Sequence, residues 1–155
     1  MSKNAVQNRA LPPAGASAIG DNERPCGTMD RTLVVDDSPT MRRMVMASLR
    51  EVCEGGFAEA ASGLEALEQL ALGPAALMIL DLNMPDMHGI EVLRFVRHHP
   101  AFRRLPVIVL TTRGDDASRS AALEAGATLY LTKPFAPHAL AGHARALIGS
   151  AAEPA

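Results

Sequence analysis

The chain has 155 residues, of which 48% are hydrophobic and 21% charged, and this balance fits one soluble globular domain with a hydrophobic core. Its formal net charge of -2 and its aromatic share of 3% argue against nucleic-acid binding, either through a basic surface or through stacking on bases. Cys26 and Cys53 form neither a disulfide framework nor a metal motif, and no apolar run reaches the roughly 18 residues of a membrane span. We therefore expect a cytoplasmic protein with no membrane partner.

Residues 1–30 are rich in Ala, Asn, Gly, Pro and Ser without a period, which predicts a disordered N-terminal lead-in. Met29 is a candidate alternative start. Beyond it, short apolar runs alternate with segments of helical period. The predicted strands are 31–35, 56–60, 76–80, 106–110 and 128–131, and the predicted helices are 39–52, 63–72, 89–98, 115–125 and 136–149.

The first predicted helix, 39–52, has a capping residue and an apolar face. Ser38 is a suitable N-cap, and Pro39 fits the first helical position. The helical period separates an inner face from an outer one. We expect Met41, Met44, Val45, Ser48, Leu49 and Val52 on the inner face, and Arg42, Arg43, Arg50 and Glu51 on the outer face.

Five consecutive strand–helix units indicate an α/β fold with a parallel sheet, right-handed crossovers and helices on both faces. We expect this domain to span residues 31–150, followed by a tail at 151–155. In such sheets ligands bind beyond the carboxyl ends of the strands, so the residues that follow each strand are the candidates for function.

Polar and charged residues follow four of the predicted strands. Together they place three carboxylates, a hydroxyl and an ammonium at one rim, with a net charge of -2. The candidates are Asp36 and Asp37 after the first strand, Asp81 and Asn83 after the third, Thr111 and Thr112 after the fourth, and Lys133 with Pro134 after the fifth, which contains Tyr130.

Carboxylates crowded in this way either take up protons or recruit a cation. Oxygen ligands without His or Cys select a hard divalent ion, and Mg²⁺ completes its shell with water and phosphate oxygens. A lysine and a hydroxyl beside it suit a phosphoryl group, which one carboxylate could accept. Each residue alone has a simpler explanation as a loop charge or a cap, but four strand ends agree on one chemistry.

The segment from Arg31 to about Gly149 resembles a receiver domain of a bacterial two-component response regulator, and is most similar to single-domain, chemotaxis-type members. The resemblance rests on the pair Asp36–Asp37, on "DLNMPDMHG" from Asp81, on "TT" from Thr111 and on "KP" from Lys133. It implies the doubly wound flavodoxin-like fold with strand order 2-1-3-4-5.

The resemblance also implies roles for these residues. Asp81 would accept the phosphoryl group from a phosphohistidine. Asp37 and Asp81 would bind Mg²⁺ directly with the backbone carbonyl of Asn83, and Asp36 would act through a water molecule. Lys133 would pair with Asp81 and then with the phosphoryl oxygens, and the Lys133–Pro134 peptide bond would be cis.

A two-state switch is implied as well. Thr111 would move toward the phosphoryl group, and Tyr130 would turn inward to fill the space that Thr111 leaves. The responding surface would be residues 115–149. Thr112 would narrow access to the site, and Arg113 with Asn83 would tune the phosphoryl lifetime. We interpret His88 as a loop residue, and Met84, Met87, Phe95 and Phe135 as packing residues.

We expect a phosphorylation-gated binding module without an output domain, because about six residues follow the last predicted helix. Its own chemistry would be self-phosphorylation and slow self-dephosphorylation. Its partners would be a histidine kinase and a downstream protein such as a flagellar motor switch or another signalling protein, with a phosphatase as a possible third. The alternatives are an aspartate-nucleophile phosphatase of the haloacid dehalogenase type and a scaffold that has lost phosphorylation.

Overall fold

The computed structural model of the chain describes residues 30–152. The predicted lead-in, with Cys26 and Met29, lies outside the described residues except for Asp30. None of the helices in the described range is long and apolar enough to cross a membrane.

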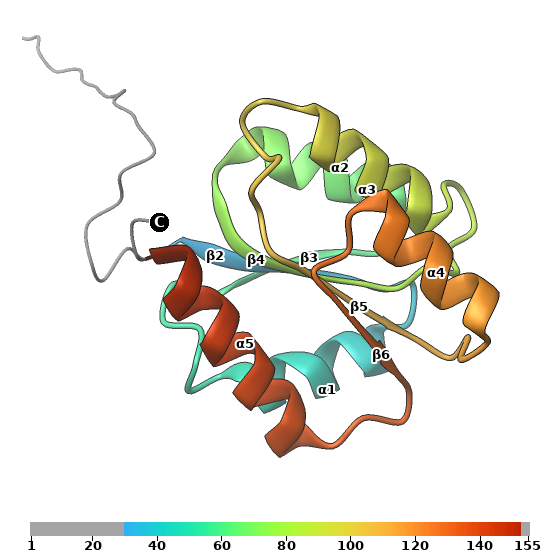
Figure 1. Cartoon of the computed structure of the whole chain (residues 1–155). Helices are drawn as coiled ribbons and strands as arrows, with labels where there is room; N and C mark the ends of the chain where they lie inside the picture. Colours follow the sequence, from blue (N-terminus) through green and yellow to red (C-terminus); the bar gives the residue numbers. More distant parts are fainter. Residues whose placement is uncertain (1–29, 153–155) are drawn as a thin grey trace, which may run out of the picture. The chain divides into compact units, whose positions relative to one another are not determined.

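Five parallel strands form the central sheet (Figure 1). They are β2 (Arg31–Val35), β3 (Phe57–Ala60), β4 (Ala75–Leu80), β5 (Val107–Thr111) and β6 (Leu129–Thr132). Their order across the sheet is β3-β2-β4-β5-β6, so the second strand along the described chain lies at one edge and the first lies inside it. This order confirms the predicted doubly wound, flavodoxin-like fold.

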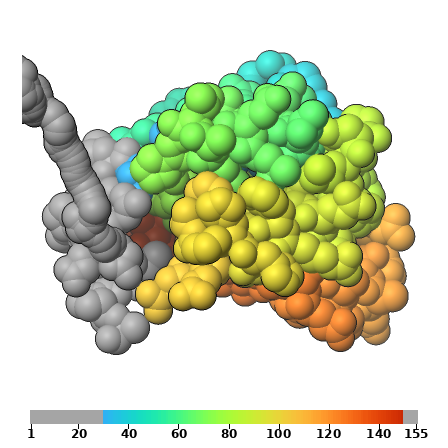
Figure 2. Space-filling model, turned by 90° about the horizontal axis from the view of Figure 1, so that it is seen from above, coloured from blue at the N-terminus to red at the C-terminus, as the bar shows by residue number. Residues whose placement is uncertain are grey.

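Five helices cover the two faces of the sheet. α1 (Pro39–Leu49) and α5 (Pro137–Ala152) lie on one face (Figure 1). α2 (Gly63–Leu72), α3 (Gly89–His98) and α4 (Asp116–Ala125) lie on the other, where Figure 2 shows them in green, yellow-green and orange. Because both faces are covered, the central strands are apolar throughout: β5 is fully buried.

Alternation along the strands divides the core between the two faces. Leu33 and Val35 point toward α2 and α3, whereas Val34 between them points toward α1 and α5. The same division runs through the neighbouring strands. Met78, Leu80, Val107 and Val109 belong to the first cluster, and Leu77, Ile79, Ile108 and Leu110 belong to the second.

The first helix differs from its prediction. α1 ends at Leu49 rather than at residue 52, and Met44 is 50% exposed. The inner stripe is Met41, Val45 and Leu49, at a spacing of four, so Met44 falls one position outside it. Arg42, expected on the outer face, is instead half-buried, because its guanidinium donates to the backbone carbonyl of Asp36.

Two further predictions are wrong in detail. α5 continues to Ala152, beyond the predicted end at 149. Phe95 is 40% exposed, and its ring lies beside that of His99 with 5.5 Å between centroids, so it is a surface residue of α3. Met84, Met87 and Phe135 do pack against the core.

Candidate functional site

The register of the parallel sheet brings four strand ends together. Val35 pairs with Leu80, so Asp36 and Asp81 are the next residues on neighbouring strands. Thr111 pairs with Thr132, so Lys133 follows directly beside Thr111. Backbone hydrogen bonds of 3.0 Å from Asp81 N to Val35 O and of 2.8 Å from Lys133 N to Thr111 O continue the pairing past the strands.

Three carboxylates form an acidic cluster at this rim, namely Asp36, Asp37 and Asp81. One oxygen from each lies within 4.8 Å of the others. Asp36 and Asp81 are buried, with 4% and 5% exposure, whereas Asp37 is exposed. Carboxylates this close repel one another when ionised, so the cluster favours a bound cation.

Lys133 provides one cation for the acidic cluster. Its Nζ lies 2.7 Å from Asp36 Oδ2 and 3.6 Å from Asp81 Oδ2. The lysine is therefore closer to Asp36 than to Asp81, the partner that the resemblance implies. The other oxygen of Asp36 accepts from the backbone N–H of Ser38 at 2.9 Å. Both oxygens of Asp36 are thus engaged, while Asp37 has no hydrogen bond or ion pair within residues 30–152.

Asp81 lies in an environment that opposes its charge. Burial raises the pKa of Asp81 above its ordinary value, and the neighbouring Asp36 adds to the rise. Lys133, the backbone N–H of Asn83 and the hydroxyl of Thr111 act in the lowering direction without cancelling it. The Asn83 N–H lies 3.3 Å from Asp81 Oδ1. A buried carboxylate in this setting gains from any group that removes its charge or pairs with it.

The segment from Asp81 to α3 is packed closely under the site. A Cβ on Gly89 would lie 2.7 Å from the carbonyl oxygen of Asp81 and 2.8 Å from Cα of Leu82, so only glycine fits there. His88 is the N-cap of α3, and its Nδ1 accepts from the N–H of Ile90 at 3.2 Å. The imidazole therefore has a capping role rather than the role of an ordinary loop residue.

Thr111 and Tyr130 lie on adjacent strands beside the acidic cluster. Thr111 is fully buried, and Tyr130 is 4% exposed. The Tyr130 hydroxyl donates to the backbone carbonyl of Arg113, whose N–H lies 3.4 Å from the Thr111 hydroxyl. Thr112 is exposed at the end of β5. The Lys133–Pro134 peptide bond is cis.

Comparison with known proteins agrees with this arrangement. Residues 32–145 match the family described as "Response regulator receiver domain". The chain belongs to the response regulator receiver domain family. It is 38% identical to the chemotaxis protein CheY1 of Helicobacter pylori over 121 residues, which are 77% of this chain and 98% of that protein.

Two more proteins resemble this receiver domain closely. The chemotaxis protein CheY homolog of Campylobacter jejuni is 39% identical over 111 residues, which cover 71% of this chain and 85% of that one. The solved structure of the chemotaxis response regulator CheY4 of Vibrio cholerae aligns with a TM-score of 0.70 at 33% identity, covering 77% of this chain and 99% of that one. The matches therefore span nearly the whole of these single-receiver proteins.

The acidic cluster of the receiver domain suits a magnesium ion. All its side-chain donors are carboxylate oxygens, they lie close enough to share one ion, and Asp37 is exposed with no partner in the described part of the chain. The burial of Asp36 and Asp81 with only one lysine between them leaves negative charge that a divalent cation would neutralise.

Two residues that support the receiver site escaped the sequence analysis. Asp86 accepts from the backbone N–H groups of Gly63 and Leu64 at 3.1 Å each, and so caps α2 from the loop before α3. Arg42 donates to the carbonyl of Asp36 at 2.6 Å and pairs with Glu59 at 2.8 Å. Both contacts join residues from different elements, so no local pattern in the sequence identifies them.

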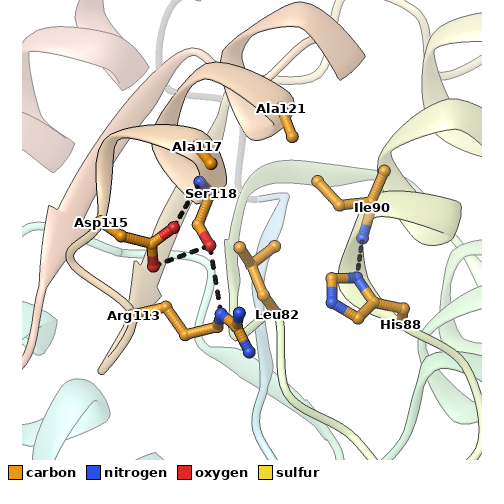
Figure 3. Close-up of a pocket in the computed structure, with 8 residues that line it drawn as sticks. All are labelled: Leu82, His88, Ile90, Arg113, Asp115, Ala117, Ser118 and Ala121. Atoms are coloured by element: carbon orange, nitrogen blue, oxygen red, sulfur yellow. Dashed lines mark hydrogen bonds between the residues drawn. The ribbon is translucent and has the colours of Figure 1, made fainter.

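A hollow of about 240 Å³ lies beside the receiver site, between the N-terminal ends of α3 and α4. Figure 3 shows His88 and Ile90 on one side, Arg113, Asp115 and Ser118 on the other, and Leu82 between them. Leu82 directly follows Asp81, so the hollow adjoins the acidic cluster.

Proposed function

We propose that this protein is a response regulator that accepts a phosphoryl group on Asp81 and thereby controls the binding of another protein. The observation that carries the proposal is the burial of Asp81 at the carboxyl end of β4, with Asp36, Asp37 and Lys133 around it. This arrangement has a nucleophile, a cation and a place for a metal ion within reach of one another.

Asp37, Asp81 and the backbone carbonyl of Asn83 would hold Mg²⁺ directly, with Asp36 acting through a water molecule. When bound, the ion supplies charge neutralisation for the oxygens of the transferred phosphoryl group. The separate roles of the two adjacent acids are supported by their contacts, because Asp36 is already engaged by Lys133 and the Ser38 N–H, whereas Asp37 is exposed.

In the transfer step, a carboxylate oxygen of Asp81 attacks phosphorus and a P–O bond forms. The P–N bond of the donor phosphohistidine breaks, and its electron pair leaves with the imidazole nitrogen, which takes up a proton. Lys133, 3.6 Å from Asp81 Oδ2, is placed to pair with the phosphoryl oxygens. The hydroxyl of Thr111 would then donate to a phosphoryl oxygen, with Thr112 narrowing the entrance.

The phosphoryl donor would be a histidine kinase, and the responding surface would be α4, β6 and α5. Tyr130 in β6 would transmit the change, because its hydroxyl contacts the loop that leads from Thr111 into α4. The chemotaxis names of the relatives favour a role in chemotaxis or a related phosphorelay, with a downstream target such as a flagellar motor switch or another signalling protein. A separate phosphatase is a further candidate partner.

We assign the receiver domain to residues 31–150, with residues 1–30 as a lead-in and 151–155 as a tail. Its own chemistry would be limited to self-phosphorylation and slow self-hydrolysis. A dehalogenase-type phosphatase needs an Asp-x-Asp pattern after its first strand, and here Asp36 and Asp37 are adjacent. No other observation favours that activity or a scaffold without phosphorylation.

The test is labelling of the full chain with phosphoramidate or acetyl phosphate in the presence of Mg²⁺. We expect stoichiometric, Mg²⁺-dependent labelling of the wild type and none of Asp81→Asn. Equal labelling of both proteins would show that Asp81 is not the acceptor. Absence of label from both would favour the scaffold, and steady turnover of a small phosphoester would favour the phosphatase.

A further inference from the structure

The loop between β5 and α4 is attached to the first turn of α4 by three side chains. Arg113 Nε donates to Ser118 Oγ at 3.1 Å, and Ser118 Oγ donates to Asp115 Oδ1 at 3.0 Å. The backbone N–H of Ser118 also donates to Asp115 Oδ2 at 2.9 Å (Figure 3). We call Arg113, Ser118 and Asp115 the loop clamp.

The Ser118 hydroxyl is the central member of the loop clamp. A serine hydroxyl has one proton and two lone pairs, so it can donate to the carboxylate and accept from the guanidinium at the same time. It thereby connects a cation and an anion that belong to the loop and to the helix cap. Hydrogen bonds to charged groups are among the stronger ones, even at an exposed site.

Arg113 connects the loop clamp to the two residues of the proposed switch. Its backbone carbonyl accepts from the Tyr130 hydroxyl, and its backbone N–H lies 3.4 Å from the Thr111 hydroxyl. Arg119, one residue after Ser118, places its guanidinium carbon 5.7 Å from the centroid of the Tyr130 ring. The side chain of Arg113 therefore fixes the position of the backbone that Tyr130 contacts.

We propose that Ser118 and Asp115 are positioning residues for the phosphorylation switch, because they hold the Arg113 carbonyl where it stabilises the inward position of Tyr130. This inference rests on the proposed function. Since any contact that favours the inward position must also favour the phosphoryl state coupled to it, loss of the clamp weakens the binding of a phosphoryl group or its mimic. Neither residue touches the phosphoryl group itself.

The experiment compares Ser118→Ala with the wild-type full chain. The substitution removes the hydroxyl but leaves the Ser118 backbone N–H that caps α4 through Asp115. Tyr130 is the only tyrosine and there is no tryptophan, so tyrosine fluorescence and its quenching by acrylamide report on this one residue. The second measurement is the Kd of beryllofluoride, a phosphoryl mimic, in the presence of Mg²⁺.

We expect Ser118→Ala to increase the quenching of Tyr130 and to weaken beryllofluoride binding about three- to ten-fold, as the loss of one charge-assisted hydrogen-bond pair implies. Saturating beryllofluoride should return the quenching to the wild-type value. Ser118→Thr, which keeps the hydroxyl, should behave like the wild type. Ser120→Ala is the matched control, because Ser120 is exposed on the same helix and has no side-chain hydrogen bond within the described range.

Wild-type quenching and affinity in Ser118→Ala would overturn the proposal, as would an equal loss in Ser120→Ala. Weaker affinity with unchanged Tyr130 quenching would also overturn it, because the effect would not pass through Tyr130. If the wild type takes up neither label nor beryllofluoride, the proposed function fails, while the quenching comparison still decides whether the clamp holds Tyr130.

Discussion

Lys133 contacts two buried carboxylates at once, with its Nζ 2.7 Å from Asp36 Oδ2 and 3.6 Å from Asp81 Oδ2. All three side chains are at most 10% exposed, so their charges are poorly screened by water. The lysine is therefore a structural requirement of the site as well as a candidate ligand for the phosphoryl group.

Lys133→Met should destabilise the metal-free protein at neutral pH by roughly 3 kcal/mol, because it leaves two buried acids without a cation. Urea unfolding in EDTA measures the change. Arg103→Met is the control, since Arg103 is exposed and its side chain has no ion pair in the described part of the chain. A Lys133→Met protein as stable as Arg103→Met would show that the lysine does not balance the two carboxylates.

Magnesium should stabilise the wild type through the acidic cluster. At ten times its Kd, a ligand specific for the folded state adds about 1.4 kcal/mol, whereas a site weakened ten-fold would add only about 0.4 kcal/mol. We therefore expect Mg²⁺ to raise the thermal midpoint of the wild type and to raise that of Asp37→Asn much less. Asp116→Asn, an exposed acid in the first turn of α4, should respond like the wild type. Equal shifts in all three proteins would place the metal elsewhere.

The close approach at Gly89 gives a prediction of opposite sign to that at another helical glycine. Gly89→Ala should cost about 1–3 kcal/mol, because the new Cβ would meet the backbone of Asp81 and Leu82 at under 3 Å. Gly142→Ala in α5 should gain about 0.5–1 kcal/mol, because nothing lies within 4 Å of that position and alanine favours the helix. Denaturant unfolding of the two variants would contradict the packing argument if both changed stability in the same direction.

Asp86 should make stability depend on pH. Burial alone would raise its pKa, but the N–H groups of Leu64, Gly63 and Met87 together outweigh that effect and lower the pKa. A lowered pKa means that the ionised carboxylate stabilises the folded state at any pH above its unfolded value of about 4. This contribution is lost as the pH falls through the lower, folded value.

Asp86→Asn should therefore be less stable than the wild type at pH 7, and the difference should disappear in strong acid. Urea midpoints measured from pH 7 down to pH 2 test this. Glu68→Gln is the matched control on α2, because Glu68 is exposed and makes no hydrogen bond or ion pair in the described range. A difference for Asp86→Asn that stays constant with pH would contradict the capping role.

Much of the fold follows from local patterns. The five strands and five helices lie within a few residues of their predicted ranges, because alternating burial and helical period are both visible in short windows. Ser38 is the N-cap of α1 as predicted, and its hydroxyl accepts from the Met41 N–H at 3.2 Å. The errors at Met44 and Phe95 arose because apolar character alone does not say which side chains the core has room to cover.

The sequence by itself determined the residue types at the strand ends and, through the alternation of elements, that Asp36, Asp37, Asp81, Thr111 and Lys133 share one rim. Only the tertiary structure decided how they are paired. It places Lys133 nearer to Asp36 than to Asp81, and it connects Arg113 through Ser118 to Asp115 and through its carbonyl to Tyr130. The reason is that register and loop packing set distances of a few tenths of an ångström between elements far apart in the chain, and no short-range pattern encodes them.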